Sequence, residues 1–194
     1  MRIPEKEWVI FDLEFTDPNL CHALKIPAEP IEIGACRFSL ETGEVKGTFE
    51  RIIQPTKHRG LTDDILNLTR LSLDSILQAS KFSEVWREFL VFTGRTRLVS
   101  WTGIDHEVLR NAYTLAEVSW PHHNNPVDAM SVVMGIAMAQ GWRPKSFGLK
   151  SVCSYLGIPR TDSHRALSDA TAVANIMCLL INKEIDSGIG NSGR

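Results

Sequence analysis

The chain has 194 residues, 43% of them hydrophobic and 23% charged, which suits one globular domain that buries a core without disulfides or metals. Its formal net charge of −2 argues against a protein that coats long nucleic-acid tracts, because such binding neutralises many phosphates. The four cysteines show no CxxC spacing, the N-terminus lacks the apolar run of a signal peptide, and no segment approaches the roughly 20 apolar residues of a membrane span. We therefore expect a cytoplasmic protein without membrane contact.

The first third of the chain has the pattern of an antiparallel meander of three strands. Residues 8–15 are apolar and β-prone at their start, which predicts a strand. A long loop is expected over residues 17–30, where proline and asparagine interrupt the pattern. The second strand is predicted over residues 31–38, and a hairpin turn at residues 41–44 leads into the third at residues 45–53.

Helical spacing of apolar residues dominates the rest of the chain. It covers residues 61–92 with a break near residues 71–73, and a short apolar strand follows at residues 97–101. Further helices are predicted over residues 105–118, 128–140, 146–156 and about 163–184. The Gly- and Ser-rich residues 186–194 are expected to form a disordered tail. Residues 1–185 are thus predicted to form a single α/β domain.

Two carboxylates lie two residues apart in the first predicted strand. Side chains of a strand alternate between its faces, so Asp12 and Glu14 leave the same face of the sheet. Their neighbours Val9, Ile10 and Leu13 indicate a buried strand, where two like charges are costly unless a divalent cation neutralises them. The alternative is an edge strand with two solvated acids, and the DxE pattern alone favours that alternative.

A third acid, Asp105, follows the short strand at residues 97–101 and the turn after it. Mixed and parallel sheets place ligands at such strand-to-helix turns, which makes Asp105 a candidate site residue. The alternative is a helix N-cap, a position that favours aspartate, and this acid alone does not decide between them.

A histidine and a fourth acid occur together at the start of the last predicted helix. His164 and Asp169 are five residues apart, so on one continuous helix they would point about 140° away from each other. They can share a site if His164 lies on the turn before the helix and Asp169 in its first turn. The alternative is a surface histidine and an acid that complements the helix dipole.

Taken together, four acids on a strand, a strand end and a helix start match the needs of a two-metal phosphodiesterase. Oxygen ligands hold two ions about 3.5–4 Å apart, and the ions activate water and stabilise the leaving oxygen. Histidine can accept a proton near pH 7, which suits removal of a proton from the attacking water.

The ordered motifs resemble the DEDDh class of DnaQ-like 3′–5′ exonucleases, which includes proofreading polymerase subunits, RNase T and the histone-mRNA 3′-end exonucleases. The resemblance covers nearly the whole chain, from Trp8 to Ile181. Its three motifs are Phe11-Asp12-Leu13-Glu14, Ser100-Trp101-Thr102-Gly103-Ile104-Asp105 and His164-Arg165-Ala166-Leu167-Ser168-Asp169-Ala170. Residues 31–35 (IEIGA) and 146–149 (SFGL) are similar to the family's second strand and to the approach to its third motif.

The resemblance implies a ribonuclease-H-like fold, with a mixed central sheet and helices on both faces. It implies that two Mg²⁺ or Mn²⁺ ions are held by Asp12, Glu14, Asp105 and Asp169, and that His164 is the general base. The implied substrate is the 3′ end of single-stranded RNA or DNA.

Two segments depart from the family pattern. After Glu14 the chain continues with Phe15-Thr16-Asp17 and a longer loop where many members have Thr-Thr-Gly. This loop is similar to that of the histone-mRNA group, so RNA is slightly favoured over DNA. Residues 68–72 (LTRLS) replace the usual LTGIT segment, which contacts the terminal base, and Arg70 in place of glycine either points to solvent or reaches the substrate. The expected substrate contacts are Phe15, Arg70, Leu71 and Ser72.

Other polar residues have two interpretations each. Five basic residues flank the third motif and either line a short phosphate track or form solvated surface: Arg143, Lys145, Lys150, Arg160 and Arg165. Asp128 is interpreted as a helix cap. His122 and His123 lie in a Pro/Asn loop without a ligand pattern, which favours a surface loop over a metal site.

Two other functions are compatible with these motifs. One is an oligoribonuclease-like hydrolase of very short RNA, which a chain-length series would reveal. The other is a catalytically silent nucleic-acid-binding or polymerase-tethering module, which should have lost at least one of the five site residues, and none is lost. A polymerase partner is not expected, because the tail after residue 185 is short, and a homodimer is compatible with the sequence.

Overall fold

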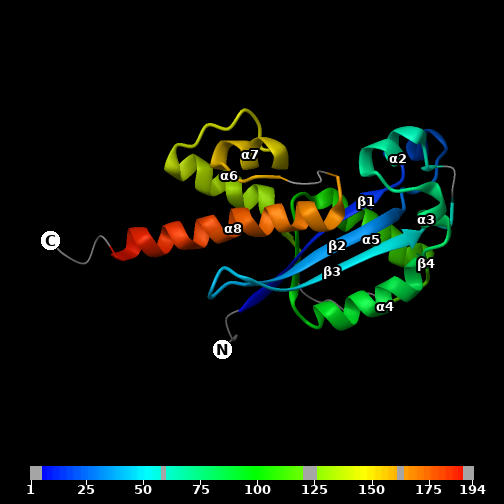
Figure 1. Cartoon of the computed structure of the whole chain (residues 1–194), viewed down its shortest axis with the longest axis horizontal. Helices are drawn as coiled ribbons and strands as arrows, with labels where there is room; N and C mark the ends of the chain where they lie inside the picture. Colours follow the sequence, from blue (N-terminus) through cyan, green and yellow to red (C-terminus); the bar gives the residue numbers. More distant parts are fainter. Residues whose placement is uncertain (1–5, 58–59, 120–125, 161–163, 190–194) are drawn as a thin grey trace.

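A six-stranded mixed sheet forms the centre of the molecule (Figure 1). The computed structural model describes residues 6–57, 60–119, 126–160 and 164–189, with side chains described as far as residue 182. Within these residues the strand order is β4-β3-β2-β1-β5-β6. The first strand of the chain is therefore an inner strand of the sheet.

The predicted meander is confirmed. β1 (Glu7–Phe15) pairs antiparallel with β2 (Pro30–Ser39), which pairs antiparallel with β3 (Val45–Gln54). The turn between β2 and β3 contains Gly43 at φ 70°, a left-handed conformation that glycine adopts without steric cost. On its other side β1 pairs in parallel with β5 (Arg97–Ser100), which makes the sheet mixed.

Two strands of two residues each were not predicted from the sequence. β4 (Ser80–Lys81) pairs in parallel with the end of β3, and β6 (Val127–Asp128) pairs in parallel with β5. A strand of two residues is too short to show an alternating pattern, so only the tertiary structure identifies it.

The expected loop over residues 17–30 is wrong in part, because α1 (Pro18–Ala23) lies within it. Asp17 caps this helix, since its Oδ1 accepts hydrogen bonds from the backbone N–H groups of Asn19 and Leu20, at 2.9 and 3.2 Å. Pro18 occupies the first helical position, where the missing N–H has no cost. Pro18 and Asn19, which are also typical of loops, therefore start a helix.

The predicted break in the helical stretch is confirmed. α2 (Asp63–Thr69) ends at Arg70, and α3 (Leu73–Leu77) begins after Ser72, whose Oγ accepts a hydrogen bond from the N–H of Ser75 at 3.0 Å. The prediction did not include the second break, where β4 separates α3 from α4 (Phe82–Thr93).

The four later helices lie close to their predicted positions. They are α5 (Gly103–Leu115), α6 (Ala129–Gln140), α7 (Leu149–Leu156) and α8 (Ala166–Ile189). α7 ends at Gly157, which has φ 70° as the predicted stop signal requires. α8 continues past its predicted end at residue 184 and into the expected tail, whereas residues 190–194 lie outside the described part of the chain.

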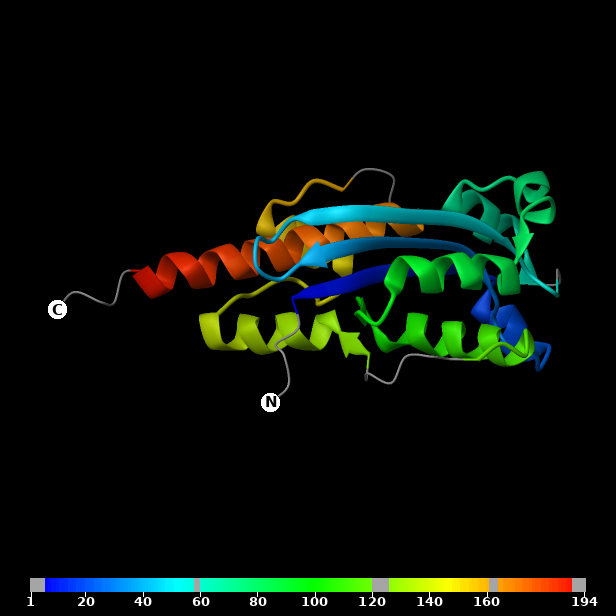
Figure 2. The same ribbon diagram turned by 90° about the horizontal axis from the view of Figure 1, so that it is seen from below.

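Helices cover both faces of the sheet, as expected (Figures 1 and 2). α4 and α5 pack on one face, where they bury Phe11, Phe89 and Leu109 with the odd-numbered residues of β1. α8 crosses the other face, and α6 and α7 join it in a second core around Ile10, Phe38 and other buried residues. The two carboxylates of β1 have even numbers and therefore lie on the face of the sheet that α8 covers.

Candidate active site

Asp12 and Glu14 project from the C-terminal part of β1, opposite Gly34 and Glu32 of β2. Because β1 is flanked by β2 and β5, the interpretation as a solvated edge strand is wrong. The side chain of Glu14 is buried, and Asp12 is partly buried. The acids are therefore held inside the molecule, as the apolar neighbours in the sequence indicated.

Asp105 is the third residue of α5 and is buried although it lies in the first turn of the helix. Its Oδ1 accepts a hydrogen bond from the backbone N–H of Leu13, 3.3 Å away in β1. The N-cap position of α5 belongs to Thr102. The helix-cap alternative is therefore wrong, since Asp105 reaches back to the strand that carries the other two acids.

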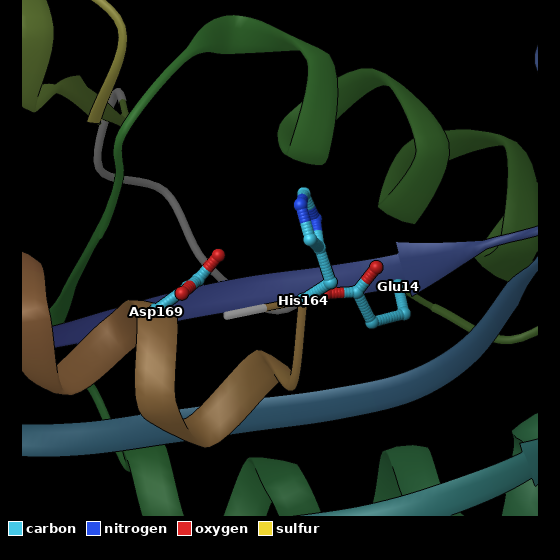
Figure 3. A group of neighbouring side chains, drawn as sticks. All are labelled: Glu14, His164 and Asp169. Atoms are coloured by element: carbon cyan, nitrogen blue, oxygen red, sulfur yellow. The ribbon is translucent and has the colours of Figure 1, made fainter. Parts of the chain in front are cut away.

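His164 lies on the turn before α8, and Asp169 lies in the first turn of that helix. His164 has φ 66°, a left-handed conformation that is uncommon for residues other than glycine and is found at strained functional positions. One possible ligand atom from each of Glu14, His164 and Asp169 lies within 4.8 Å of the others. Figure 3 shows these three side chains approaching from β1, from the turn and from α8.

Burial raises the pKa values of three of the acids. It raises the pKa of Glu14 to about 8, with repulsion from Asp169 adding to the effect. Burial also raises the pKa of Asp105 to about 7. The pKa of Asp12 lies well above its ordinary range because of burial and of the charges of Asp105 and Glu14. Without a cation, these carboxyl groups hold protons at a pH where isolated acids have lost them.

The donor set fits divalent cations. Four carboxylates supply the oxygen ligands that Mg²⁺ and Mn²⁺ prefer, and they converge from β1, α5 and α8 on one place. Burial and, to a smaller extent, mutual repulsion raise the pKa values of Asp12, Glu14 and Asp105, and bound cations would offset both effects. Asp12, Glu14, Asp105 and Asp169 are thus the residues that would hold such ions.

Glu32 has a role that the sequence did not reveal. Its side chain is fully buried and accepts hydrogen bonds from Arg165, from Nε at 2.9 Å and from Nη2 at 2.6 Å. The same carboxylate accepts the backbone N–H of Ala166 at 2.9 Å, which is the first residue of α8. Glu32 therefore fixes the start of α8, between His164 and Asp169. A glutamate between the apolar residues Ile31 and Ile33 is the signal that the sequence offers.

Gly34 allows α8 to lie directly on β2. A Cβ atom at this position would be 2.0 Å from the backbone nitrogen of Leu167, so no side chain fits there. This contact and the Glu32 hydrogen bonds set the distance between the third motif and the acids of β1. The sequence pattern IEIGA therefore has a structural reason for both its glutamate and its glycine.

Arg160 is the basic residue that enters the acid cluster. Its Nη2 pairs with Oδ1 of Asp169, and only 11% of each side chain is exposed. Arg165, by contrast, pairs with Glu32 and Glu50. Of the two interpretations given for the basic residues, phosphate track or solvated surface, neither describes Arg165, whose ion pairs join the start of α8 to β2 and β3.

A cavity of about 820 Å³ opens beside the third motif. Three exposed cations line it, namely Arg143, Lys145 and Lys150, together with Tyr155, and its lining also includes Arg160, His164 and Asp169. We call it the basic groove. It therefore places three cations in the same cavity as two of the candidate catalytic residues, His164 and Asp169.

The predicted substrate contacts have defined structural positions. Phe15 is half-buried and packs against the core between the sheet and helices α4 and α5. Leu71 is buried with Ile31 and Ile76. Ser72 caps α3, and Arg70 is exposed with φ 59° at the C-terminus of α2. Arg70 thus adopts the left-handed conformation that glycine would favour at this place. Contact of these residues with substrate stays a prediction.

Other predictions concern residues away from the acids. Asp128 caps α6, as expected, because its Oδ1 accepts the N–H of Ser131 at 2.8 Å. His122 and His123 lie outside the described residues. None of the helices in the described part of the chain has both the length and the apolar composition needed to cross a membrane.

The chain is similar to known nucleases and to part of a DNA polymerase. A family model described as exonuclease (RNase T) matches residues 9–177. The DNA polymerase III PolC-type of Staphylococcus epidermidis is 26% identical over 190 residues, which are 97% of this chain but only 12% of the polymerase. This chain therefore corresponds to about one eighth of the length of the curated relatives that it matches.

Two solved structures share the fold. Cell-death related nuclease 4 superposes with a TM-score of 0.82 at 19% identity, covering 93% of this chain and 65% of the nuclease. The nuclease domain of 3′hExo, a DEDDh family member bound to rAMP, superposes with a TM-score of 0.81 at 18% identity, covering 94% and 95% of the two chains. The expected ribonuclease-H-like fold of the DEDDh exonucleases is confirmed.

Proposed function

Because the chain belongs to the RNase T family of exonucleases, we propose that it removes nucleotides from the 3′ end of single-stranded nucleic acid. The observation that carries this proposal is the meeting of Asp12, Glu14, Asp105 and Asp169 beside His164. These five residues come from three separate parts of the sequence, and each fills a position of the DEDDh pattern. The catalytically silent alternative would need one of them to be missing.

The four acids would hold two divalent ions, Mg²⁺ or Mn²⁺, which supply an activated water and stabilise the leaving oxygen when bound. The remaining chemistry belongs to the chain itself. His164 is exposed on a turn that is not part of α8, so its ring can accept the proton of the attacking water and pass it to solvent. Glu32 and Gly34 keep this turn and Asp169 in register with β1.

The basic groove supports nucleic acid as the substrate class. Arg143, Lys145 and Lys150 offer positive charge for a few phosphates next to His164. Three cations on a chain with a net charge of −2 suit a short footprint at one end of a strand. This footprint supports an end-directed enzyme in preference to one that binds along a duplex.

RNA as the preferred substrate is part of the proposal, together with a cytoplasmic location. The relatives point in different directions, since one is a DNA polymerase and another is a nuclease domain bound to rAMP. The loop that favoured RNA contains α1 and follows directly on β1, the strand of Asp12 and Glu14, and this position supports a role in distinguishing the sugar of the terminal nucleotide.

The test is digestion of matched DNA and RNA oligonucleotides that carry a label at the 3′ or the 5′ end, with Mg²⁺, Mn²⁺ or EDTA. We expect the 3′ label to be released first as a mononucleotide, a shortening ladder from the 5′-labelled strand, and no reaction in EDTA. Early release of the 5′ label or unchanged rates in EDTA would contradict the proposal. A series of 2- to 30-nucleotide RNAs, lengths chosen to span about one to several phosphate footprints, separates it from an oligoribonuclease-like enzyme.

A further inference from the structure

One cation lies inside the acid cluster itself. Arg160 follows α7 and the turn at Gly157, and its guanidinium pairs with Asp169. The whole Arg160 side chain is 11% exposed. Its Nε is buried and has no hydrogen-bond partner among the described residues. A buried donor without a partner is costly, so this position has a reason other than hydrogen bonding alone.

The reason is the charge of the acids around it. Asp12, Glu14, Asp105 and Asp169 lie close together, and their repulsion destabilises the ionised site when no cation is present. Among the described basic residues, Arg160 forms an ion pair with an acid of the site, Asp169. Arg165 forms an ion pair with Glu32. The charge of Arg160 acts on Asp12 as well, since it favours the ionised form of that acid.

Asp169 cannot serve Arg160 and a metal ion equally. The guanidinium occupies Oδ1 of Asp169, and a divalent ion bound to this carboxylate would lie a few ångströms from a positive charge in a buried place. Like charges at such a distance repel strongly when little water separates them. Binding of the ion therefore favours movement of the guanidinium away from Asp169.

The basic groove offers the guanidinium another position. Arg160 lines this groove and also a second cavity of about 310 Å³, next to Glu50 and Asn175. A long side chain on a segment outside the helices can change rotamer between these two spaces without a movement of α7 or α8. In this movement the guanidinium leaves Asp169, which is one of the acids that would bind the ion.

We infer that Arg160 is an internal counter-cation, which neutralises Asp169 in the metal-free protein and competes with the divalent ion for this carboxylate. This inference rests on the proposed metal site. It assigns Arg160 a regulatory effect on metal affinity, because each ion bound must displace a charge that the chain itself supplies. Arg160 thereby stabilises the folded metal-free site and lowers the affinity of this site for divalent ions.

The test compares the full-length wild type with Arg160→Met and Arg160→Gln, two neutral variants, by calorimetric titration with MnCl₂ in the absence of nucleic acid. Arg143→Met is the matched control, since it removes an arginine of the same groove that is not paired with the acids. We expect the two Arg160 variants to bind Mn²⁺ at least about five-fold more tightly than wild type, the lower end of typical coupling between two binding events. The control should match wild type.

Melting temperatures give a second readout that does not depend on activity. The metal-free Arg160 variants should melt below metal-free wild type, and saturating Mn²⁺ should reduce this difference. Equal or weaker Mn²⁺ binding by both variants, or an equal gain in the Arg143 control, would overturn the inference and leave the metal site intact. If wild type itself binds no Mn²⁺, the proposed metal site is wrong and the inference fails with it.

Discussion

His164 combines an exposed side chain with a strained backbone, and this combination separates it from the buried acids that surround it. A metal ligand is normally fixed by a second hydrogen bond, whereas a proton carrier must exchange with solvent. The ring lies near the carboxylates of Glu14 and Asp169, so geometry alone is compatible with both roles. Its position on a turn before the helix supports the role of general base.

The first prediction distinguishes these roles. His164→Gln should lower kcat by about 10²-fold or more, because loss of a general base commonly costs 10²–10⁴-fold. The Mn²⁺ affinity of the variant, measured by calorimetry, should stay within about three-fold of wild type, a small effect beside the 10–100-fold losses that follow disturbance of metal ligands. A parallel loss of metal affinity and activity would instead make His164 a metal ligand.

The residues of the site differ in how far the sequence predicts them. Asp12 and Glu14 were predictable, because period-2 alternation fixes the face of a strand and apolar neighbours indicate burial. The role of Asp105 is less predictable, because aspartate is common near the start of a helix without any catalytic function. The sequence does not reveal the roles of Glu32 and Arg160, because their partners are 133 and 9 residues away and only the folded chain brings them together.

Elements were predictable where their signals are long and regular. The three long strands are runs of apolar and β-prone residues between loop and turn signals, and α5, α7 and α8 show helical spacing of apolar residues. The sequence does not distinguish α1 from a loop, because its capping residue Asp17 and its proline Pro18 are also typical of loops. The two-residue strands β4 and β6 exist only through pairing with a neighbour, so no local pattern could reveal them.

Gly34 gives a prediction about the contact between β2 and α8. Gly34→Ala should lower the free energy of unfolding by about 2 kcal/mol or more, because its Cβ would overlap the backbone of Leu167. Activity should fall with it, since the start of α8 carries Asp169. Gly47→Ala on β3 is the matched control, because its Cβ would make an ordinary contact of 3.9 Å with Phe92. Equal denaturation midpoints for the two variants would refute the close-packing argument.

Arg70 gives a prediction about the end of α2. Arg70→Gly should raise the free energy of unfolding by about 0.5–1 kcal/mol, because glycine tolerates φ 59° without a Cβ clash. Arg70→Ala removes the guanidinium but keeps the backbone strain, so it should not share this gain. Chemical denaturation of both variants checks the difference.

The same pair of variants tests the contact of Arg70 with substrate. If the guanidinium binds the terminal nucleotide, both variants should raise KM for a single-stranded oligonucleotide and flatten its dependence on salt, while kcat changes less. KM values equal to wild type at low and at high salt would assign Arg70 to solvent.

The charge of the whole site links the stability of the molecule to pH. Glu14 and Asp105 have pKa values of about 8 and about 7 in the folded chain, above their ordinary values of 4.5 and 3.8. Between about pH 5 and pH 8 the folded state therefore binds protons that the unfolded state has released, and unfolding becomes more favourable as the pH rises. Below this range both states are increasingly protonated, and the effect is absent.

In EDTA, the free energy of unfolding should thus fall by about 2 kcal/mol or more between pH 5.5 and pH 8, since one pKa unit corresponds to about 1.4 kcal/mol. Saturating Mn²⁺ at pH 8 should restore this stability, because the ions replace the protons. Denaturant titrations at the two pH values check both statements. A stability that is constant or rises over this range in EDTA would show that the acids are not crowded in the folded chain.

The central claim is that distant acids form one hydrolytic centre, and removal of Asp12 tests it most directly. The measurement is the rate of nucleotide release from a 5′-labelled single-stranded oligonucleotide by wild type, by Asp12→Ala and by Asp74→Ala, an exposed acid of α3, under the same Mn²⁺ concentration. We predict that Asp12→Ala lowers the rate by at least several hundred-fold, because it removes an electrostatic contact of the transition state. Its melting temperature should be unchanged or higher, because the substitution relieves repulsion in the metal-free site. Asp74→Ala should retain the wild-type rate. A rate near wild type for purified, folded Asp12→Ala would contradict the account.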